Sequence, residues 1–271
     1  MSTLDGQFWD KAWNPVRVKG GGWHCTKISP GCQNCWAEDY NKRFGNDLPF
    51  DNREVKFELA QRILEQPLYW GKPRIIATQW VGDIFHEQIP IEFIYQILNK
   101  IGLSHHNYLI LTKRPKIMKE IFDDRKMITP NLWLGVSICT QREADEKIPL
   151  LLQTPAAHHF INFEPLLENI DFRCPTCKGT GFYGDNGPGV KGNREYVACD
   201  ICHNQKPDWV QLGSESGFGR RPMKLEWARN IVEQCKAAGV KIWIKQIEIN
   251  GKIEKDMNKF PEDLKLRQWP L

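Results

Sequence analysis

The segment YLILTKRPKIMKEIF, residues 108–122, contains the unit on which the fold prediction rests. Its first part, 108–112, is almost continuously apolar, and Lys113 and Arg114 follow directly. Its last part, 116–122, has the apolar spacing of an amphipathic helix. A continuously apolar strand is typical of a parallel sheet that is covered on both faces. The segment therefore predicts a strand, a basic turn and a helix.

The same alternation continues on both sides of this segment. We expect strands at 74–81, 108–112, 132–137, 159–163, 209–213 and 241–246, and helices at 35–44, 90–101, 116–122, 141–152 and 225–238. Six or seven such units in 271 residues predict an α/β fold, namely a full or partial TIM-like (β/α) barrel. A doubly wound open sheet is the alternative. The stretch before the first helix, rich in Gly and Trp, is expected to be loop and turn.

The series is interrupted at about 173–207, where glycines and cysteines replace the apolar pattern. We therefore expect the barrel to consist of residues 1–172 and 208–271, with 173–207 as an inserted metal-binding segment. The composition fits an ordinary soluble protein, since apolar residues make up 41% and the net charge is only +4. Residues 1–10 lack the basic region followed by an apolar one that is typical of a leader, and no apolar run approaches the about 20 residues that span a bilayer. We expect a cytoplasmic protein with no membrane partner.

Polar residues follow most of the predicted strands. In parallel α/β folds the functional site lies at the carboxyl ends of the strands, so these residues are expected to line one site. They are Asp83, Lys113, Arg114, Ser137, Glu164, Glu215, Lys245 and Gln246.

Three cysteines near the N-terminus have the spacing C-x6-C-x2-C: Cys25, Cys32 and Cys35. Three thiolates can hold three irons of a [4Fe–4S] cluster and leave the fourth iron open for a ligand. Two alternatives remain open at this point. The cysteines can bind zinc together with His24 or a distant residue, or they can stay reduced and unligated.

A three-cysteine loop before a strand-helix series resembles the radical S-adenosylmethionine superfamily, whose usual spacing is C-x3-C-x2-C. The chain is more similar to an uncharacterised family of phages and bacteria, known as a domain of unknown function and thought to be of this type. The similar stretches are 13–15, 25–35, 83–86, 111–115, 131–137, 163–167, 213–217, 220–223 and 245–246.

This resemblance implies a catalytic [4Fe–4S] cluster on the three cysteines, with S-adenosylmethionine as cofactor. Its cleavage would give a 5′-deoxyadenosyl radical, and a reductase or other electron donor would be a partner. Candidate cofactor contacts follow from charge and from position near the motifs. They are the carboxylates Asp83, Glu164 and Glu215, the cations Lys113, Arg114, Arg221 and Lys245, the polar residues Ser137 and Gln246, and Trp36 as a shield for the cluster.

Four further cysteines form two C-x2-C pairs: Cys174, Cys177, Cys199 and Cys202. This pattern predicts a structural zinc site that folds the glycine-rich insertion. A second iron–sulfur cluster and haem attachment through Cys199, Cys202 and His203 are the alternatives. Lys178, Lys191, Arg194, Phe182 and Tyr183 offer phosphate and stacking contacts of the kind that single-stranded nucleic acid uses.

The sequence therefore predicts a radical enzyme, with a nucleic acid or nucleotide as the preferred substrate and a peptide or small metabolite left open. Two other classes remain open. One is a non-enzymatic, zinc-stabilised nucleic-acid-binding module, and the other is a zinc-dependent hydrolytic barrel enzyme.

Overall fold

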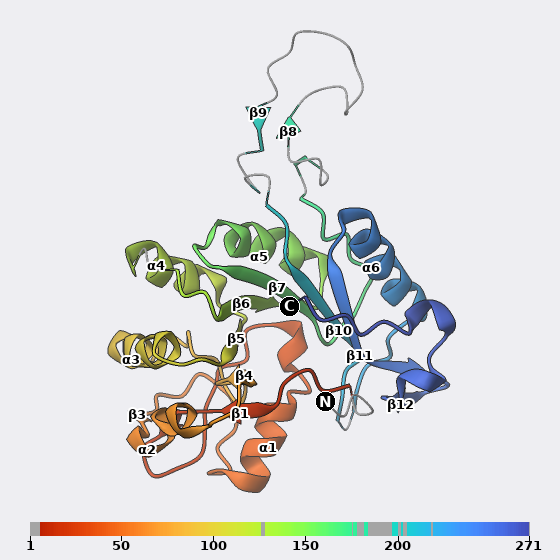
Figure 1. Ribbon diagram of the computed structural model, residues 1–271. Helices are drawn as coiled ribbons and strands as arrows, with labels where there is room; N and C mark the ends of the chain where they lie inside the picture. The colour runs from red at the N-terminus through yellow and green to blue at the C-terminus, as the bar shows by residue number, and fades with distance from the viewer. Residues whose placement is uncertain are drawn as a thin grey trace.

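The computed structural model describes residues 6–125, 128–174, 176–177, 182–183, 197–199, 202, 205–217 and 219–270. Its main element is an eight-stranded sheet in the order β1-β4-β5-β6-β7-β10-β11-β12 (Figure 1). Neighbouring strands are parallel except for the last pair, in which β12 runs antiparallel to β11. The α/β prediction with a mostly parallel sheet is confirmed.

The strands of this sheet are β1 (Lys11–Trp13), β4 (Ile75–Thr78), β5 (Asn107–Thr112), β6 (Leu132–Ser137), β7 (His158–Phe163), β10 (Trp209–Gly213), β11 (Lys241–Ile249) and β12 (Lys252–Glu254). Two small antiparallel pairs join β2 (Val16–Val18) to β3 (Phe57–Leu59) and β8 (Phe182–Tyr183) to β9 (Val197–Ala198). The α-helices are α1 (Trp36–Phe44), α2 (Gln61–Leu64), α3 (Ile91–Gly102), α4 (Pro115–Arg125), α5 (Gln141–Gln153) and α6 (Leu225–Ala238). Short 3-10 helices are η1 (Pro30–Cys32), η2 (Gln66–Tyr69), η3 (Met257–Lys259) and η4 (Glu262–Leu264).

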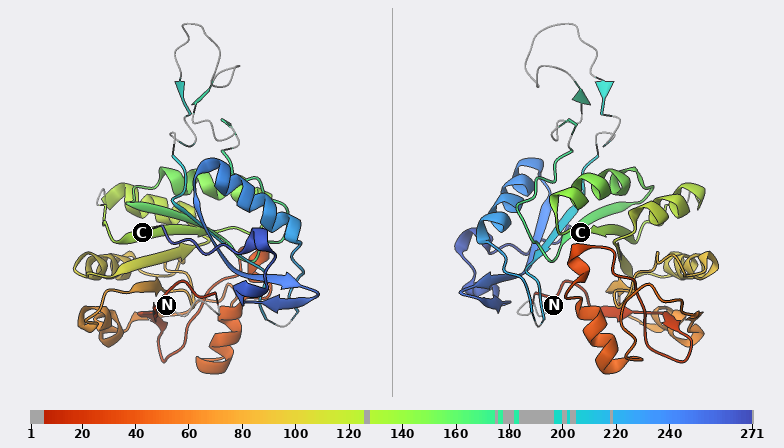
Figure 2. Two further views of the ribbon diagram at one scale, coloured as in Figure 1. Left: turned by 45° about the vertical axis from the view of Figure 1, so that its right-hand side comes forward. Right: turned by 180° about the vertical axis from the view of Figure 1, so that it is seen from behind.

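The strands of the sheet follow one another in chain order. A doubly wound sheet would reverse its order at a central strand, and this sheet does not. Since parallel crossovers are right-handed, a sheet of this order carries its helices on one face. Helices α3 to α6 accordingly lie in an arc around the outside of the sheet (Figures 1 and 2).

The sheet is open, so the full barrel of the sequence prediction is not formed. The free edge of β11 is occupied by the chain that follows it. β12 folds back on the end of β11. The C-terminal segment bonds to the first half of β11: Ile244 N donates to Leu266 O at 2.8 Å, and Gln268 N donates to Ile242 O at 2.9 Å. Among the described residues no ladder joins this edge to β1.

The central strands β4, β5, β6, β7 and β10 bury both of their faces, in different clusters. In β5, Tyr108 and Ile110 belong to the core between the sheet and the outer helices, whereas Leu109 faces inward. The inner cluster is mainly aromatic and includes residues from both ends of the chain: Phe8, Ile75, Leu109, Trp133, Phe160, Trp209 and Trp243, with Trp9, Trp80, Leu111 and Trp269 packed against it.

Some element boundaries differ from the prediction. The strand expected at 74–81 ends at Thr78, because Gln79 adopts a left-handed backbone with φ 55°. The Gln79 side chain pairs with the main chain of Val16, accepting from its N at 3.0 Å and donating to its O at 2.9 Å. The N-terminal stretch expected to be loop contains β1 and β2.

No α-helix in the described parts of the chain has both the length and the apolar character needed to cross a membrane.

Candidate functional site

A cavity of about 410 Å³ opens at the carboxyl ends of the parallel strands. This volume lies within the range of about 300–1,000 Å³ that is usual for small-molecule sites. The structure brings every site residue that was predicted outside the insertion to this cavity, except Arg221. Those that line it are Cys25, Cys32, Cys35, Trp36, Asp83, Lys113, Arg114, Ser137, Glu164, Glu215, Lys245 and Gln246.

The cysteine loop is shaped by a short 3-10 helix and by the start of α1. Ser29 caps the 3-10 helix, since its Oγ accepts from the N of Gly31 at 3.1 Å, and Cys32 lies buried at its end. Cys35 is the N-cap residue of α1. Gly31 packs closely on Cys139, whose Sγ would lie 3.3 Å from a Cβ added at this glycine. These contacts restrain the conformation of the loop beside the carboxyl ends of the strands.

Glu215 and Arg221 clamp this loop to the end of β10. Arg221 Nε donates to Glu215 Oε2 at 2.9 Å, and Arg221 Nη2 bonds both Glu215 Oε1 and the O of Pro30. Asn34 Nδ2 donates to the same carboxylate at 3.0 Å. Burial would raise the pKa of Glu215, but the bonds from Arg221 lower it below its usual value. Both residues hold the loop, and Arg221 does so from outside the cavity lining.

Arg114 lies against the sulfur of Cys25. Its Nη1 donates to Cys25 Sγ at 3.8 Å and to Asp83 Oδ2 at 3.2 Å, and its Nε donates to Glu87 Oε1 at 2.8 Å. Asp83 also accepts from Thr112 Oγ1 at 2.8 Å. The carboxylate of Asp83 thus fixes Arg114 at the end of β5, so that the guanidinium faces the cysteine loop.

Two lysines line the cavity from different strands, Lys113 directly after β5 and Lys245 within β11. Lys113 Nζ donates to Ser137 Oγ at 2.9 Å, and Lys245 Nζ donates to Glu164 Oε1 at 2.6 Å. Gly213 makes room for the second pair, because a Cβ at this position would lie 3.2 Å from Glu164 Cδ. Gln246 is buried and donates to the O of Ser214 at 2.7 Å.

Burial favours the protonated thiol at two of the loop cysteines, Cys25 and Cys35. Burial raises the pKa of Cys25 to about 12, and the charge of Asp83 adds to this effect while Arg114 opposes it. Burial also raises the pKa of Cys35, although the main-chain N–H groups of Glu38 and Ala37 at the start of α1 act in the other direction. A metal that binds here must displace these protons.

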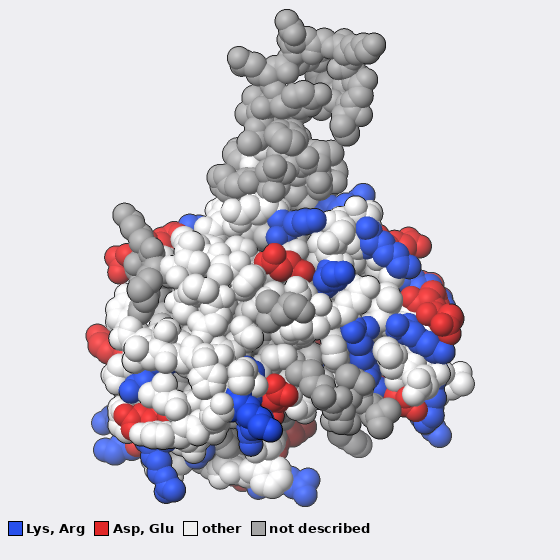
Figure 3. All heavy atoms as spheres, viewed as in Figure 1, with Lys and Arg blue, Asp and Glu red and all other residues white. Residues whose placement is uncertain are grey.

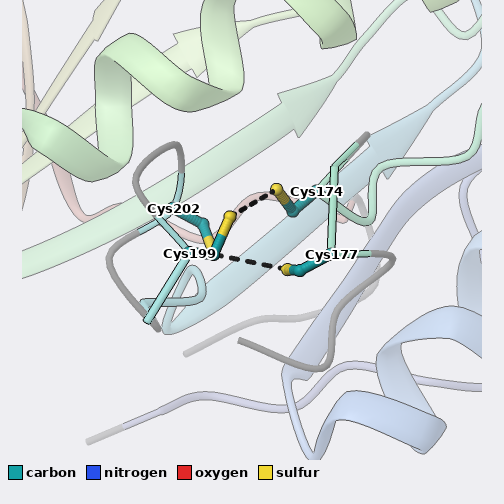
Figure 4. Close-up of side chains that lie close together, drawn as sticks. All are labelled: Cys174, Cys177, Cys199 and Cys202. Atoms are coloured by element: carbon teal, nitrogen blue, oxygen red, sulfur yellow. Dashed lines mark hydrogen bonds between the residues drawn. The ribbon is translucent and has the colours of Figure 1, made fainter. Parts of the chain in front are cut away.

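The four cysteines of the insertion form a compact group (Figure 4). The sulfurs of Cys174 and Cys199 are 3.6 Å apart, as are those of Cys177 and Cys202, and all four lie within 4.8 Å of one another. All are buried in the main apolar core. This buried group can hold a metal, such as zinc or an iron–sulfur centre.

The three loop cysteines do not form a second group of this kind. Among the described residues, only the four-cysteine set brings three or more metal-ligating side chains within reach of a single ion. His24 is buried and packs against Phe50 and His86. It does not line the cavity.

Other residues predicted to bind a ligand in the insertion are not placed by the structure. Lys178, Lys191, Arg194 and His203 lie outside the described residues. Phe182 and Tyr183 form β8, of which only the main chain is described.

The cavity has lining residues that the sequence reasoning missed. Asn162 is the clearest, because it alternates with Ile161 and Phe163 and so points to the inner face. The alternation of β7 could have identified it. Trp9 and Trp80 also line the cavity. Trp9 belongs to no strand, and Trp80, which was predicted to lie in the strand at 74–81, follows the left-handed turn at Gln79, so the alternation of a strand does not place either side chain.

Comparison with known proteins gives a family match. No curated protein and no solved structure shows significant similarity to the chain. The family model described as "Protein of unknown function (DUF5131)" matches residues 5–268. This match extends over nearly the whole sequence, and the chain therefore belongs to the DUF5131 family.

Proposed function

We propose that this protein is a radical S-adenosylmethionine enzyme, with a [4Fe–4S] cluster on Cys25, Cys32 and Cys35. The observation that carries the proposal is that all three cysteines line one cavity at the carboxyl ends of the strands. The open sheet, wound in one direction, would then act as a partial (β/α) barrel around the reacting groups.

The donor set fits a cluster better than it fits a single ion. Three thiols share the cavity, yet they are not grouped closely enough to surround one metal. A cubane cluster needs sulfurs that are further apart, because each thiolate binds a different iron. His24, which a zinc site at the loop could use as its fourth ligand, does not line the cavity. These observations favour the cluster over a hydrolytic zinc centre.

The surroundings of the loop suit a cluster held by thiolates. Arg114 donates to Cys25 Sγ, and hydrogen bonds to cluster sulfurs tune the reduction potential. Cys35 lies at the N-terminus of α1, where the helix dipole favours negative charge. We assign to Arg114 the role of stabilising the thiolate of Cys25, and to Asp83 that of positioning Arg114.

The remaining charged groups suit the amino acid part of S-adenosylmethionine. When bound, the cluster and this cofactor supply a reductive cleavage that yields a hydrogen-abstracting radical. Glu164 would receive the cofactor's ammonium group, and Lys245 or Lys113 its carboxylate, through charge-assisted hydrogen bonds. Ser137 and Gln246 are candidates for the ribose or adenine. Trp36 is 44% exposed and stands at the rim of the cavity, where it would shield a cluster only in part.

We further propose that the four-cysteine group binds a single zinc ion. Four thiolates at about 2.3 Å from one tetrahedral zinc are about 3.8 Å from each other. The measured separations of 3.6 Å, within an overall limit of 4.8 Å, are close to this value. Because the cysteines belong to the main core and Cys174 and Cys202 lie beside α5, the ion would fasten the insertion to the barrel.

A nucleic acid or nucleotide is the proposed substrate. On the described part of the face shown in Figure 3, charges of both signs are interspersed, so this face offers little long-range attraction and local contacts must supply the affinity. Trp36, Tyr40 and Phe44 form such a contact surface on α1, which we call the aromatic row. All three are exposed, and their ring centroids are 6.4 Å and 4.9 Å apart in sequence order. The row begins at the cavity rim and suits stacked bases.

The test is anaerobic reconstitution followed by iron, sulfide and zinc analysis, with visible and electron paramagnetic resonance spectra. We expect about four irons per chain in the loop site and one zinc in the insertion. Incubation with dithionite, in place of the electron donor, and S-adenosylmethionine should give 5′-deoxyadenosine. Cys32→Ala should abolish both the cluster and this product. A Cys32→Ala protein that still forms the product would refute the proposal.

A further inference from the structure

A row of polar side chains crosses the inner face of the sheet below the cysteine loop. Ser137 on β6, Asn162 on β7 and Gln211 on β10 are register neighbours, and Lys113 Nζ donates to Ser137 Oγ at one end. The three are 2%, 5% and 0% exposed. We call these three residues the polar row. Trp243 on β11 continues it as an apolar neighbour of Gln211.

Two of the three residues in the polar row have buried side-chain atoms without a hydrogen-bond partner in the protein. Asn162 Oδ1 is buried and unpaired, and so are both polar atoms of the Gln211 side chain. Whichever way the carboxamide of Asn162 is turned, one buried polar end lacks a partner. Native proteins satisfy nearly all such groups, so unpaired ones are expected where a ligand or an ordered water binds. Asn162 lines the cavity, so a ligand bound there can contact the polar row through the side chain of Asn162.

The cavity above Asn162 provides two further kinds of contact. Trp9, Trp80 and Leu111 give it apolar and aromatic walls, which suit the faces of a planar ring. Lys113 has one acceptor in Ser137 and carries three donors, so it can also bind an anionic group. A carboxamide presents a donor and an acceptor in one plane, the arrangement that reads the edge of a nucleobase.

We propose that Asn162 recognises the edge of a nucleobase bound in this cavity, with Gln211 behind it as a positioning residue. The inference rests on the proposed function in that the base belongs either to the substrate or to S-adenosylmethionine. The chemistry is the same in the two cases, and the experiment distinguishes them. A base seated against the sheet would place its sugar and phosphate toward the lysines and the cysteine loop.

The test combines ligand binding with thermal stability, and it needs no turnover. The probes are the four nucleoside 5′-monophosphates and S-adenosylhomocysteine, with ribose 5-phosphate as a probe that lacks a base. Affinities are measured by calorimetry on the reconstituted protein. Asn162→Leu should weaken the best base-containing probe by about 5- to 100-fold, because a lost bidentate contact has about this effect. Ribose 5-phosphate should bind equally to both proteins.

The same variant has an expected effect on stability that a structural asparagine would not have. Replacing an unpaired buried amide by an apolar group of similar shape should raise the Tm of the ligand-free protein by about 2–4 °C. Thr78→Val is the matched control, since Thr78 Oγ1 is also buried and unpaired but does not line the cavity. It should leave the affinities unchanged. If Asn162→Leu does not fold, Asn162→Ala serves for the binding arm.

The binding results distinguish the two sources of the base. A loss confined to S-adenosylhomocysteine assigns the base to the cofactor, and a loss confined to a monophosphate assigns it to the substrate. Unchanged affinities for the Asn162 variants, or no binding of any base-containing probe, would overturn the inference. Ordered water alone on Asn162 in a crystal soaked with the best probe would do the same. The iron and 5′-deoxyadenosine assays are independent, so the proposed function can fail while this inference stands.

Discussion

Arg114 Nη1 donates to the sulfur of Cys25 at 3.8 Å, although the two residues are 89 positions apart in the sequence. The contact depends on the end of β5, which delivers Arg114, and on Asp83, which accepts from the same Nη1 at 3.2 Å. Arg114 is 5% exposed, so its charge is stabilised mainly by Asp83, Glu87 and the loop. This arrangement links the cysteine loop to the core of the sheet.

Arg114→Gln should therefore affect both stability and the cluster. Removing one partner of a buried ion pair should lower the free energy of unfolding by about 3 kcal/mol, measured by urea denaturation. The loss of a donor and a positive charge at Cys25 should also make the reduction potential of the cluster more negative, measured by a potentiometric titration. Arg142→Gln, at an exposed site on α5, is the control and should change neither quantity. An unchanged potential would show that Arg114 does not act on the cluster.

Arg221→Ala should release the cysteine loop. Arg221 bonds Glu215 and the O of Pro30, so its loss removes the clamp between the loop and β10. We expect faster amide hydrogen exchange in residues 25–35, by about tenfold, with little change in the outer helices. Arg229→Ala removes an exposed ion pair with Asp263 and should leave the loop unaffected. Equal exchange in the two variants would contradict the clamp.

The sequence predicted the repeating units well, because their physical signal is local. The apolar run at 108–112 and the spacing at 116–122 became β5 and α4 with small changes at the ends. The polar strand ends also converge as expected, since parallel strands end on one side of a sheet. The need for glycine at position 135 could not be predicted from local sequence. A Cβ there would lie 2.3 Å from the ring of Phe160, which belongs to the neighbouring strand.

Features that depend on long-range pairing were not predictable. β1 has three residues, and its parallel pairing with β4 is set by contacts over 65 positions, such as Lys11 with Ile76. The edge of β11 is covered by the C-terminal segment, which has no strand pattern in its sequence, so this pairing was not predicted. The role of Arg221 as a clamp was missed for the same reason, since its partner Pro30 is 191 residues away.

Cys199→Ser should remove one zinc ion and destabilise the protein. Cys199 is fully buried in the core cluster, so loss of the metal would leave three thiols and a hydroxyl inside it. We expect a fall in Tm of at least about 4 °C and the loss of one zinc equivalent, measured by metal analysis. Cys235→Ser is the control, because Cys235 is equally buried but stands alone. It should keep the zinc, and a Cys199→Ser protein with full zinc would exclude the site.

His86 should make the protein less stable as the pH falls from about 6.5 to about 4. Burial, together with the charge of Arg114, lowers the pKa of His86 to about 4. Its Nδ1 accepts from the N of Gln88 at 3.2 Å, so the ring is neutral and its Nε2 donates to Thr26 Oγ1 at 2.9 Å. The unfolded chain binds this proton near pH 6.5, whereas the folded chain resists it.

The stabilisation due to neutral His86 is therefore complete above about pH 6.5 and is lost progressively down to pH 4, by up to about 3 kcal/mol. His86→Gln should make the free energy of unfolding less dependent on pH over this interval, measured by urea denaturation at several pH values. His105→Gln, at an exposed histidine, should keep the slope of the parent protein. The same slope in the parent and His86→Gln proteins would show that another group titrates.

The aromatic row on α1 should bind single-stranded nucleic acid. Residues four apart on a helix are separated by about 6 Å along the axis, so Trp36, Tyr40 and Phe44 can each contact a successive base of an extended strand. Tyr40→Ala and Phe44→Ala should each weaken binding of a single-stranded oligonucleotide by at least about fivefold, measured by fluorescence anisotropy at fixed salt. Tyr69→Ala removes an aromatic side chain that is 79% exposed on η2 and should have no effect. If all three variants bind like the parent protein, the oligonucleotide does not lie along α1, and a mononucleotide in the cavity becomes the better substrate.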